Sequence, residues 1–265
     1  MTQAITVPKL RQYKRDGEKI ACLTAYDATF ARVLENTGVE VVLVGDSLGT
    51  VIQGHATTVP VTLAHMAYHT ACVRRGLQRA LLLADLPFAS YPTPRQAVAG
   101  AAKLMRAGAQ MVKLEGGRSR LEAVRALVAE GIPVCGHLGL LPQSIHRLGR
   151  YRVQGADPQA AQRLLEDACL LEEAGIDLLV LECIPATLAE AVTAEVSVPT
   201  IGIGAGPHCD GQVLVLHDLL GLWPDGTPPR FVKDFLAGAG GIEAAVRAYV
   251  EAVKAGDFPA EAHCY

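Results

Sequence analysis

The strongest constraint on the fold is a regular alternation of short apolar runs with helical patterns. Eight apolar runs, each short enough to be a strand, follow one another from residue 19 onward, and turn residues separate them from amphipathic stretches. Eight strands joined by helices in 265 residues favour a closed (β/α)8 barrel, a TIM barrel of the α/β class, over an open doubly wound sheet. We therefore predict one barrel domain over residues 1–265, with a short N-terminal extension. The expected strands cover residues 19–24, 41–44, 80–84, 110–114, 132–135, 177–181, 198–201 and 212–216.

Capping residues predict where the intervening helices begin. Asp27 is an expected N-cap, and two capping boxes are expected, one at residues 119–122 and one at residues 187–190. Two helices are predicted near the end of the chain, from about residue 230 and over residues 241–255.

Charge and hydropathy exclude several classes of function. The formal net charge is −3, and no basic patch is evident, so we do not expect nucleic-acid binding. No stretch reaches about 18 uncharged apolar residues, and the N-terminus lacks the apolar run of a signal peptide. We expect a cytoplasmic protein without membrane attachment.

Polar side chains stand at the ends of five successive predicted strands. The C-terminal ends of parallel barrel strands meet at one mouth, so we expect these side chains to converge there. Four carboxylates around one lysine would repel one another unless a cation bound among them. Oxygen donors favour a hard divalent ion, Mg²⁺, Mn²⁺ or Co²⁺, over zinc. The residues concerned are Asp46 with Ser47, Asp85, Lys113 with Glu115, His137 and Glu182.

This set of residues predicts enolate chemistry. Each residue alone also has an ordinary structural explanation: a turn aspartate, an ion pair between Lys113 and Glu115, or a core histidine. Their coincidence on five strand ends favours a site. A divalent ion beside a lysine suits a 2-oxo acid, and a separate glutamate could remove the proton next to its carbonyl group. The spacing leaves the identity of the substrate open.

Six motifs narrow the interpretation. In chain order they read GDSLGTVIQGHATTVPVTLAHMAYHT, ADLPFASY, VKLEGG, GHLGLLPQSIH, LVLECIP and PTIGIGAGPHCDGQVLVLHDLLG. Over about residues 19–259 the chain resembles the ketopantoate hydroxymethyltransferase family, with Ala56 where Asp is usual and Ala89 where Gly is usual. The resemblance implies a barrel of the phosphoenolpyruvate/pyruvate-binding type. It also implies transfer of a one-carbon unit from 5,10-methylenetetrahydrofolate to 3-methyl-2-oxobutanoate, giving 2-dehydropantoate in the first step of pantothenate biosynthesis.

The resemblance also implies a role for each predicted site residue. Three residues would form the Mg²⁺ site: Asp46, Asp85 and Glu115. Five would contact the 2-oxo acid: Asp46, Ser47, Asp85, Lys113 and His137. Glu182 would be the catalytic proton acceptor that generates the Mg²⁺-stabilised enolate. A homodecamer of two pentameric rings is also implied.

Two other interpretations remain open at this point. A metal-dependent lyase or aldolase of the same barrel group would act on another 2-oxo acid without folate. A metabolite-binding protein would keep the site but lack turnover, although the presence of Asp46, Asp85 and Glu182 argues against it.

Overall fold

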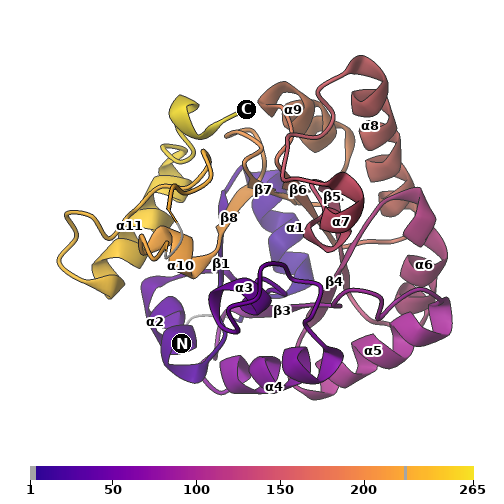
Figure 1. The fold of residues 1–265 in the computed structure, drawn as a ribbon, viewed down its shortest axis with the longest axis horizontal. Helices are drawn as coiled ribbons and strands as arrows, with labels where there is room; N and C mark the ends of the chain where they lie inside the picture. The colour runs from indigo at the N-terminus through magenta and orange to yellow at the C-terminus, as the bar shows by residue number, and fades with distance from the viewer. Residues whose placement is uncertain (1–3, 224–225) are drawn as a thin grey trace.

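The computed structural model describes residues 4–223 and 226–265, and a closed barrel of eight parallel strands forms its centre (Figure 1). Each strand pairs with the next in the chain, and the last closes the barrel by pairing Gly211 with Ile20 of the first. The strands are β1 (Ile20–Thr24), β2 (Val41–Val44), β3 (Leu81–Asp85), β4 (Met111–Glu115), β5 (Val134–Gly139), β6 (Leu178–Glu182), β7 (Thr200–Ile203) and β8 (Gly211–Leu214). The predicted (β/α)8 barrel is confirmed.

Both faces of the strands are buried, which explains why their sequences are nearly continuous apolar runs. In β2, Val41 and Leu43 point into the barrel, whereas Val42 and Val44 pack beneath the surrounding helices. The same two-residue period separates the two faces of the other strands. The interior therefore has its own hydrophobic core, distinct from the layer between strands and helices.

Among the described residues, seven longer helices surround the barrel. They are α2 (Ala28–Thr37), α4 (Leu63–Arg74), α5 (Pro94–Arg106), α6 (Leu121–Ala129), α8 (Pro158–Glu173), α9 (Ala186–Glu195) and α11 (Ile242–Ala255). Asp27 caps α2 as predicted, because its Oδ1 accepts hydrogen bonds from the amides of Thr29 and Phe30. Within the described part of the chain, no helix is both long and apolar enough to span a bilayer.

Both predicted capping boxes are wrong. Residues 118–120 form a 3₁₀ turn, so α6 begins only at Leu121 and its N-cap, Arg120, makes no side-chain capping bond. Arg118 Nε donates to Asp167 Oδ1 of α8 at 2.6 Å, which ties this turn to the neighbouring helix. Helix α9 begins at Ala186, directly after Pro185, and again lacks a capping side chain.

The helix predicted from about residue 230 is absent, and the described residues 226–241 are neither helix nor strand. Pro228 and Pro229 lie at its expected start, and three glycines follow at positions 238, 240 and 241, a composition that disfavours a helix. The segment instead buries Phe231, Val232 and Phe235 against the barrel. The helix predicted over residues 241–255 is confirmed as α11.

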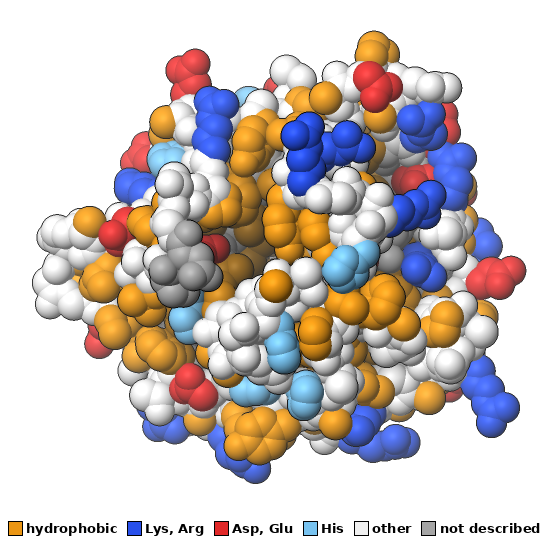
Figure 2. Space-filling view, in the orientation of Figure 1, with side chains coloured by type: hydrophobic (Ala, Val, Ile, Leu, Met, Phe, Trp, Pro, Cys, Tyr) orange, Lys and Arg blue, Asp and Glu red, His pale blue; other side chains and the backbone are white. Residues whose placement is uncertain are grey.

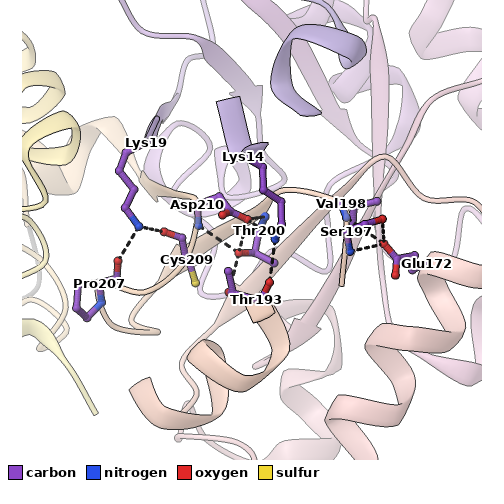
Figure 3. A network of polar contacts seen from close by, with 10 residues as sticks. All are labelled: Lys14, Lys19, Glu172, Thr193, Ser197, Val198, Thr200, Pro207, Cys209 and Asp210. Carbon is purple, nitrogen blue, oxygen red and sulfur yellow. Dashed lines mark hydrogen bonds and ion pairs between the residues drawn. The ribbon is translucent and has the colours of Figure 1, made fainter. Parts of the chain in front are cut away.

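One end of the barrel is closed by α1 (Val7–Asp16), a helix that the sequence analysis did not predict. Figure 1 shows α1 behind the strands, at the end where they begin. Its Leu10 and Tyr13 are buried in the interior core, and Lys14 Nζ donates to Asp210 Oδ2 at 2.8 Å (Figure 3). Three short helices lie at the opposite end, which we call the mouth: α3 (Leu48–Val51), α7 (Ile145–Leu148) and α10 (Leu216–Leu219).

Candidate active site

Polar residues occupy the interior positions of the strands where these reach the mouth. Along β4, Met111 belongs to the interior core, and Lys113 and Glu115 follow at two-residue intervals on the same face. The strand register then sets Lys113 beside Asp85 and Glu115 beside His137. A cavity of about 140 Å³, the inner cavity, lies among these side chains. All seven predicted site residues line it: Asp46, Ser47, Asp85, Lys113, Glu115, His137 and Glu182.

Lys113 is the positive centre of the inner cavity. Its Nζ lies 3.0 Å from Asp85 Oδ1 and 3.2 Å from His137 Nδ1, and its side chain is 5% exposed. Burial opposes its charge, but the nearby carboxylates, Asp85 foremost, raise the pKa of Lys113 above its ordinary value. Lys113 therefore stays an ammonium ion in the folded protein.

His137 is held neutral and oriented by its neighbours. Burial, together with the positive charge of Lys113, lowers the pKa of His137 well below its usual range. Because the ammonium of Lys113 has only protons to donate, Nδ1 of the neutral ring is the acceptor in this pair. The ring proton is then on Nε2, which lies 3.2 Å from Glu182 Oε2 and faces that carboxylate.

Acidic side chains outnumber basic ones in the inner cavity. Burial and the neighbouring Asp85 raise the pKa of Asp46 to about 7, and burial raises the pKa of Glu182 to about 7. Burial also raises the pKa of Glu115 well above its usual range. In the protein alone, these carboxyl groups therefore retain protons at a pH where exposed carboxyl groups are ionised.

Two buried residues that the sequence analysis missed hold this group in place. Gln143 Nε2 donates to Asp46 Oδ2 at 2.9 Å and to the Leu86 carbonyl oxygen at 3.0 Å. Tyr91 donates to Gln143 Oε1 at 2.6 Å and accepts from the amide of Glu115. Both lie within quoted motifs, ADLPFASY and GHLGLLPQSIH, but no local pattern marks them as polar contacts of the site.

The loop before Tyr91 carries backbone strain. Ala89 has a φ of 57°, in the left-handed region that disfavours residues with a side chain. This conformation explains why glycine suits the position. Alanine at position 89, in place of the usual glycine, is therefore unfavourable by about 1 kcal/mol.

The donor set of the inner cavity fits a hard divalent cation. Asp85 Oδ1, apart from its ion pair with Lys113, and Glu115 Oε1 are buried oxygens that receive no hydrogen bond from the described residues. Within residues 4–223 and 226–265, no three His, Cys, Asp or Glu side chains form a ready metal-binding group. Mg²⁺ is compatible with this arrangement because it is commonly bound by one or two carboxylates, with water and substrate oxygens completing its shell.

A second cavity of about 470 Å³, the outer cavity, adjoins the inner one. Ser47, Glu182 and Asp218 line both cavities, so the two share a wall. Figure 2 shows this face of the molecule hollowed near its centre between hydrophobic side chains. Asp218 lies on α10, one turn beyond β8, and the sequence analysis did not assign it a role.

A family profile and individual relatives match this chain over nearly its whole length, and they point to the same family. The profile of the family described as ketopantoate hydroxymethyltransferase matches residues 4–261. A protein of Methylococcus capsulatus named 3-methyl-2-oxobutanoate hydroxymethyltransferase is 62% identical, covering 100% of this chain and 98% of its own. The protein of the same name from Thiobacillus denitrificans is 60% identical, covering 98% of this chain and 99% of its own.

Solved structures show similarity at the level of the fold. A phosphonopyruvate hydrolase has a TM-score of 0.63 at 12% identity, covering 83% of this chain and 84% of its own. A 2,3-dimethylmalate lyase, described as a member of the PEP mutase/isocitrate lyase superfamily, has a TM-score of 0.60 at 16% identity, covering 81% of each chain. These structures share the barrel fold of this chain.

Proposed function

Because the chain belongs to the ketopantoate hydroxymethyltransferase family, we propose that it uses 5,10-methylenetetrahydrofolate as one-carbon donor, Mg²⁺ as metal and Glu182 as catalytic base. Its reaction is that of its curated relatives, a transfer of a hydroxymethyl group to 3-methyl-2-oxobutanoate that forms ketopantoate for pantothenate biosynthesis. The observation that carries the assignment of the base is the position of Glu182 at the boundary between the two cavities, against neutral His137.

Lys113 and Ser47 are proposed to bind the 2-oxo acid in the inner cavity. The ammonium of Lys113 offsets the negative charge of the substrate carboxylate, and a buried cation does so more strongly than an exposed one. The Ser47 hydroxyl, 2.8 Å from the Tyr26 hydroxyl, supplies a polar contact. His137, on β5, would contact the substrate or Glu182. Asp46 and Asp85 are the remaining residues proposed to contact the 2-oxo acid.

Asp46 and Asp85 would hold Mg²⁺, with Glu115 completing the site directly or through water. When bound, the ion would polarise the 2-oxo group as a Lewis acid and neutralise part of the carboxylate charge. Asp85 is held for this role by the backbone amide of Asp46, which donates to Asp85 Oδ2 at 3.0 Å. Gln143 similarly orients Asp46.

Glu182 takes the proton from C3 of the oxo acid, and the electron pair left behind gives the enolate. General-base catalysis of this kind contributes about 10² to 10⁴ in rate. C3 then forms a bond to the methylene carbon of the donor, and both bonds from that carbon to N5 and N10 of the folate break. Water supplies the hydroxyl oxygen. The two nitrogens take up one proton from water and the one that Glu182 removed, so tetrahydrofolate leaves. A pKa of about 7 suits Glu182 for accepting this proton near neutral pH.

Two further properties belong to this proposal. We propose that the chain assembles as a homodecamer of two pentameric rings, which light scattering of the purified protein would test. We also propose that the enzyme acts in the cytoplasm, consistent with a described structure that has no helix able to span a membrane.

The decisive experiment is exchange of the C3 proton of 3-methyl-2-oxobutanoate in D₂O, with and without Mg²⁺, followed by addition of methylenetetrahydrofolate. We expect exchange that depends on Mg²⁺, and ketopantoate once the folate is present. Exchange without ketopantoate would support the folate-independent lyase or aldolase. Binding of the oxo acid without exchange or product, even with folate present, would support a protein that binds without catalysis.

A further inference from the structure

The outer cavity is positioned to hold a second substrate, because it shares a wall with the inner cavity. Glu182 and Ser47 line both cavities, so a molecule in the outer cavity meets the oxo acid at the residue that takes its C3 proton. The outer volume, about 470 Å³, exceeds the 140 Å³ of the inner cavity. The smaller substrate therefore fits the inner cavity and the larger donor fits the outer one.

The walls of the outer cavity suit a flat, largely apolar ring. Three aromatic side chains line it, from Tyr151, Phe231 and Tyr265, together with the apolar side chains of Leu140 and Pro142. Tyr151 is 54% exposed, so the aromatic lining extends to the surface. Aromatic faces stack favourably on planar heterocycles, at centroid separations of about 4.5–7 Å for offset or edge arrangements.

Asp218 gives this apolar cavity one specific polar feature. Its carboxylate accepts no hydrogen bond from any side chain or amide within the described residues, and burial raises the pKa of Asp218 to about 6. Asp218 is half-buried, and a ligand that filled the outer cavity would cover its carboxylate. Covering a carboxylate without giving it a partner is unfavourable, so a ligand with N–H donors would be favoured here. Glu182, the other carboxylate among the described lining residues, is assigned to the base.

We propose that the outer cavity binds the pterin ring of the one-carbon donor and that Asp218 accepts hydrogen bonds from its 2-amino and N3–H groups. These two donors lie side by side on one edge of the ring and match the two oxygens of a carboxylate. The exposed Arg152 at the rim fits the carboxylates of the donor's glutamate tail. The inference rests on the proposed function, since it assigns the site of the proposed co-substrate.

The first test measures tetrahydrofolate binding to the full chain by calorimetry, comparing wild type with Asp218→Asn. An amide keeps the shape but loses one acceptor and the charge, so we expect the dissociation constant to rise about 10- to 100-fold. The KM for methylenetetrahydrofolate should rise by a similar factor, and far more than the KM for the oxo acid. Unchanged tetrahydrofolate affinity would overturn the proposal.

A ligand change tests the same contact without relying on the variant's stability. Tetrahydrofolate lacking the 2-amino group should bind wild type at least about tenfold more weakly than tetrahydrofolate itself. In Asp218→Asn this difference should largely vanish, because the partner of that group is altered. Equal binding of the two ligands by wild type would contradict the assignment, even if the variant did not fold.

The matched control is Asp257→Asn, which removes an exposed aspartate remote from both cavities and should leave tetrahydrofolate binding unchanged. The two proposals fail differently. Wild type that exchanges the C3 proton but makes no ketopantoate with the folate would overturn the proposed function. Wild type that makes ketopantoate, combined with normal tetrahydrofolate binding by Asp218→Asn, would overturn only the assignment of the pterin site.

Discussion

The two ends of the barrel differ in how their charged side chains are paired. At the end closed by α1, charged groups have partners: Lys14 pairs with Asp210 at 2.8 Å and Arg11 with Asp177 at 2.8 Å. Asp210 also accepts from the amide of Thr200, again at 2.8 Å (Figure 3). At the mouth, four carboxyl groups surround the single ammonium of Lys113, and two of their oxygens, Asp85 Oδ1 and Glu115 Oε1, lack hydrogen bonds within the described residues.

We infer from this contrast that the charged groups at the closed end stabilise the fold, whereas those at the mouth serve the reaction. Paired charges at the end closed by α1 connect α1 and the β7–β8 connection to the strands, and they contribute to the free energy of unfolding. The acidic groups crowded at the mouth are costly to bury in their ionised form, and a bound cation and substrate would compensate for this cost. Substitutions at the two ends should therefore differ in which property they change.

The largest effect is expected for Glu182→Gln at the mouth. The amide cannot accept the C3 proton, so kcat should fall about 10²- to 10⁴-fold, with only a small change in the KM for the oxo acid. Stability should not fall, because a buried acid has been replaced by a neutral group of the same shape. Product assays and D₂O exchange measure the first effect. Glu190→Gln, at an exposed site, is the control, and full activity in Glu182→Gln would contradict the role of Glu182.

At the closed end, Asp210→Ala should lower the free energy of unfolding by about 2–3 kcal/mol, because Lys14 and the Thr200 amide lose a charged partner. Below the unfolding transition, kcat and KM should match wild type. Urea denaturation gives the free energy. Arg11→Ala, which removes an ion pair with a more exposed arginine at the same end, should change stability by about 0.2–1 kcal/mol. A loss of kcat in folded Asp210→Ala would contradict the separation of the two ends.

Gln143→Leu tests whether the mouth depends on a residue that orients its carboxylates. Asp46 Oδ2 loses its hydrogen bond, and the Tyr91 hydroxyl loses its acceptor. We expect Mg²⁺ affinity to fall about 10- to 100-fold, as for other residues that orient metal ligands. Calorimetric titration with Mg²⁺ measures this directly, and Tyr91→Phe should show a smaller loss. Normal Mg²⁺ affinity in Gln143→Leu would show that Asp46 does not need this partner.

The pH dependence of proton exchange should be governed by Glu182. Only its ionised form accepts a proton, and its pKa is raised to about 7, so the exchange rate should fall about tenfold per unit below pH 7. Because the folded-state pKa lies above the unfolded value, the same group makes its full contribution to stability below about pH 4. That contribution is lost as the pH rises toward 7. Exchange rates that are flat between pH 5 and 7 would contradict this assignment.

Much of the fold was predictable because its signals are local. The period of two along β4 placed Lys113 and Glu115 on one face, and the apolar runs located eight strands. Capping was less predictable, because Ser119 lies in a turn that the contact between Arg118 and α8 holds. The segment after residue 230 was misread as helix because its buried aromatic residues, Phe231 and Phe235, resemble a helical pattern.

The sequence by itself determined the alternation of strands and helices and the polar residues that end the strands, because both depend on neighbouring residues and on a fixed backbone period. Only the tertiary structure decided which distant groups meet. Gln143 contacts Asp46 across 97 positions, and α1 contacts Asp210 across 196. The neutral state of His137 and the raised pKa of Asp218 likewise arise from burial, which exists only once the barrel has closed and its loops have packed over the mouth.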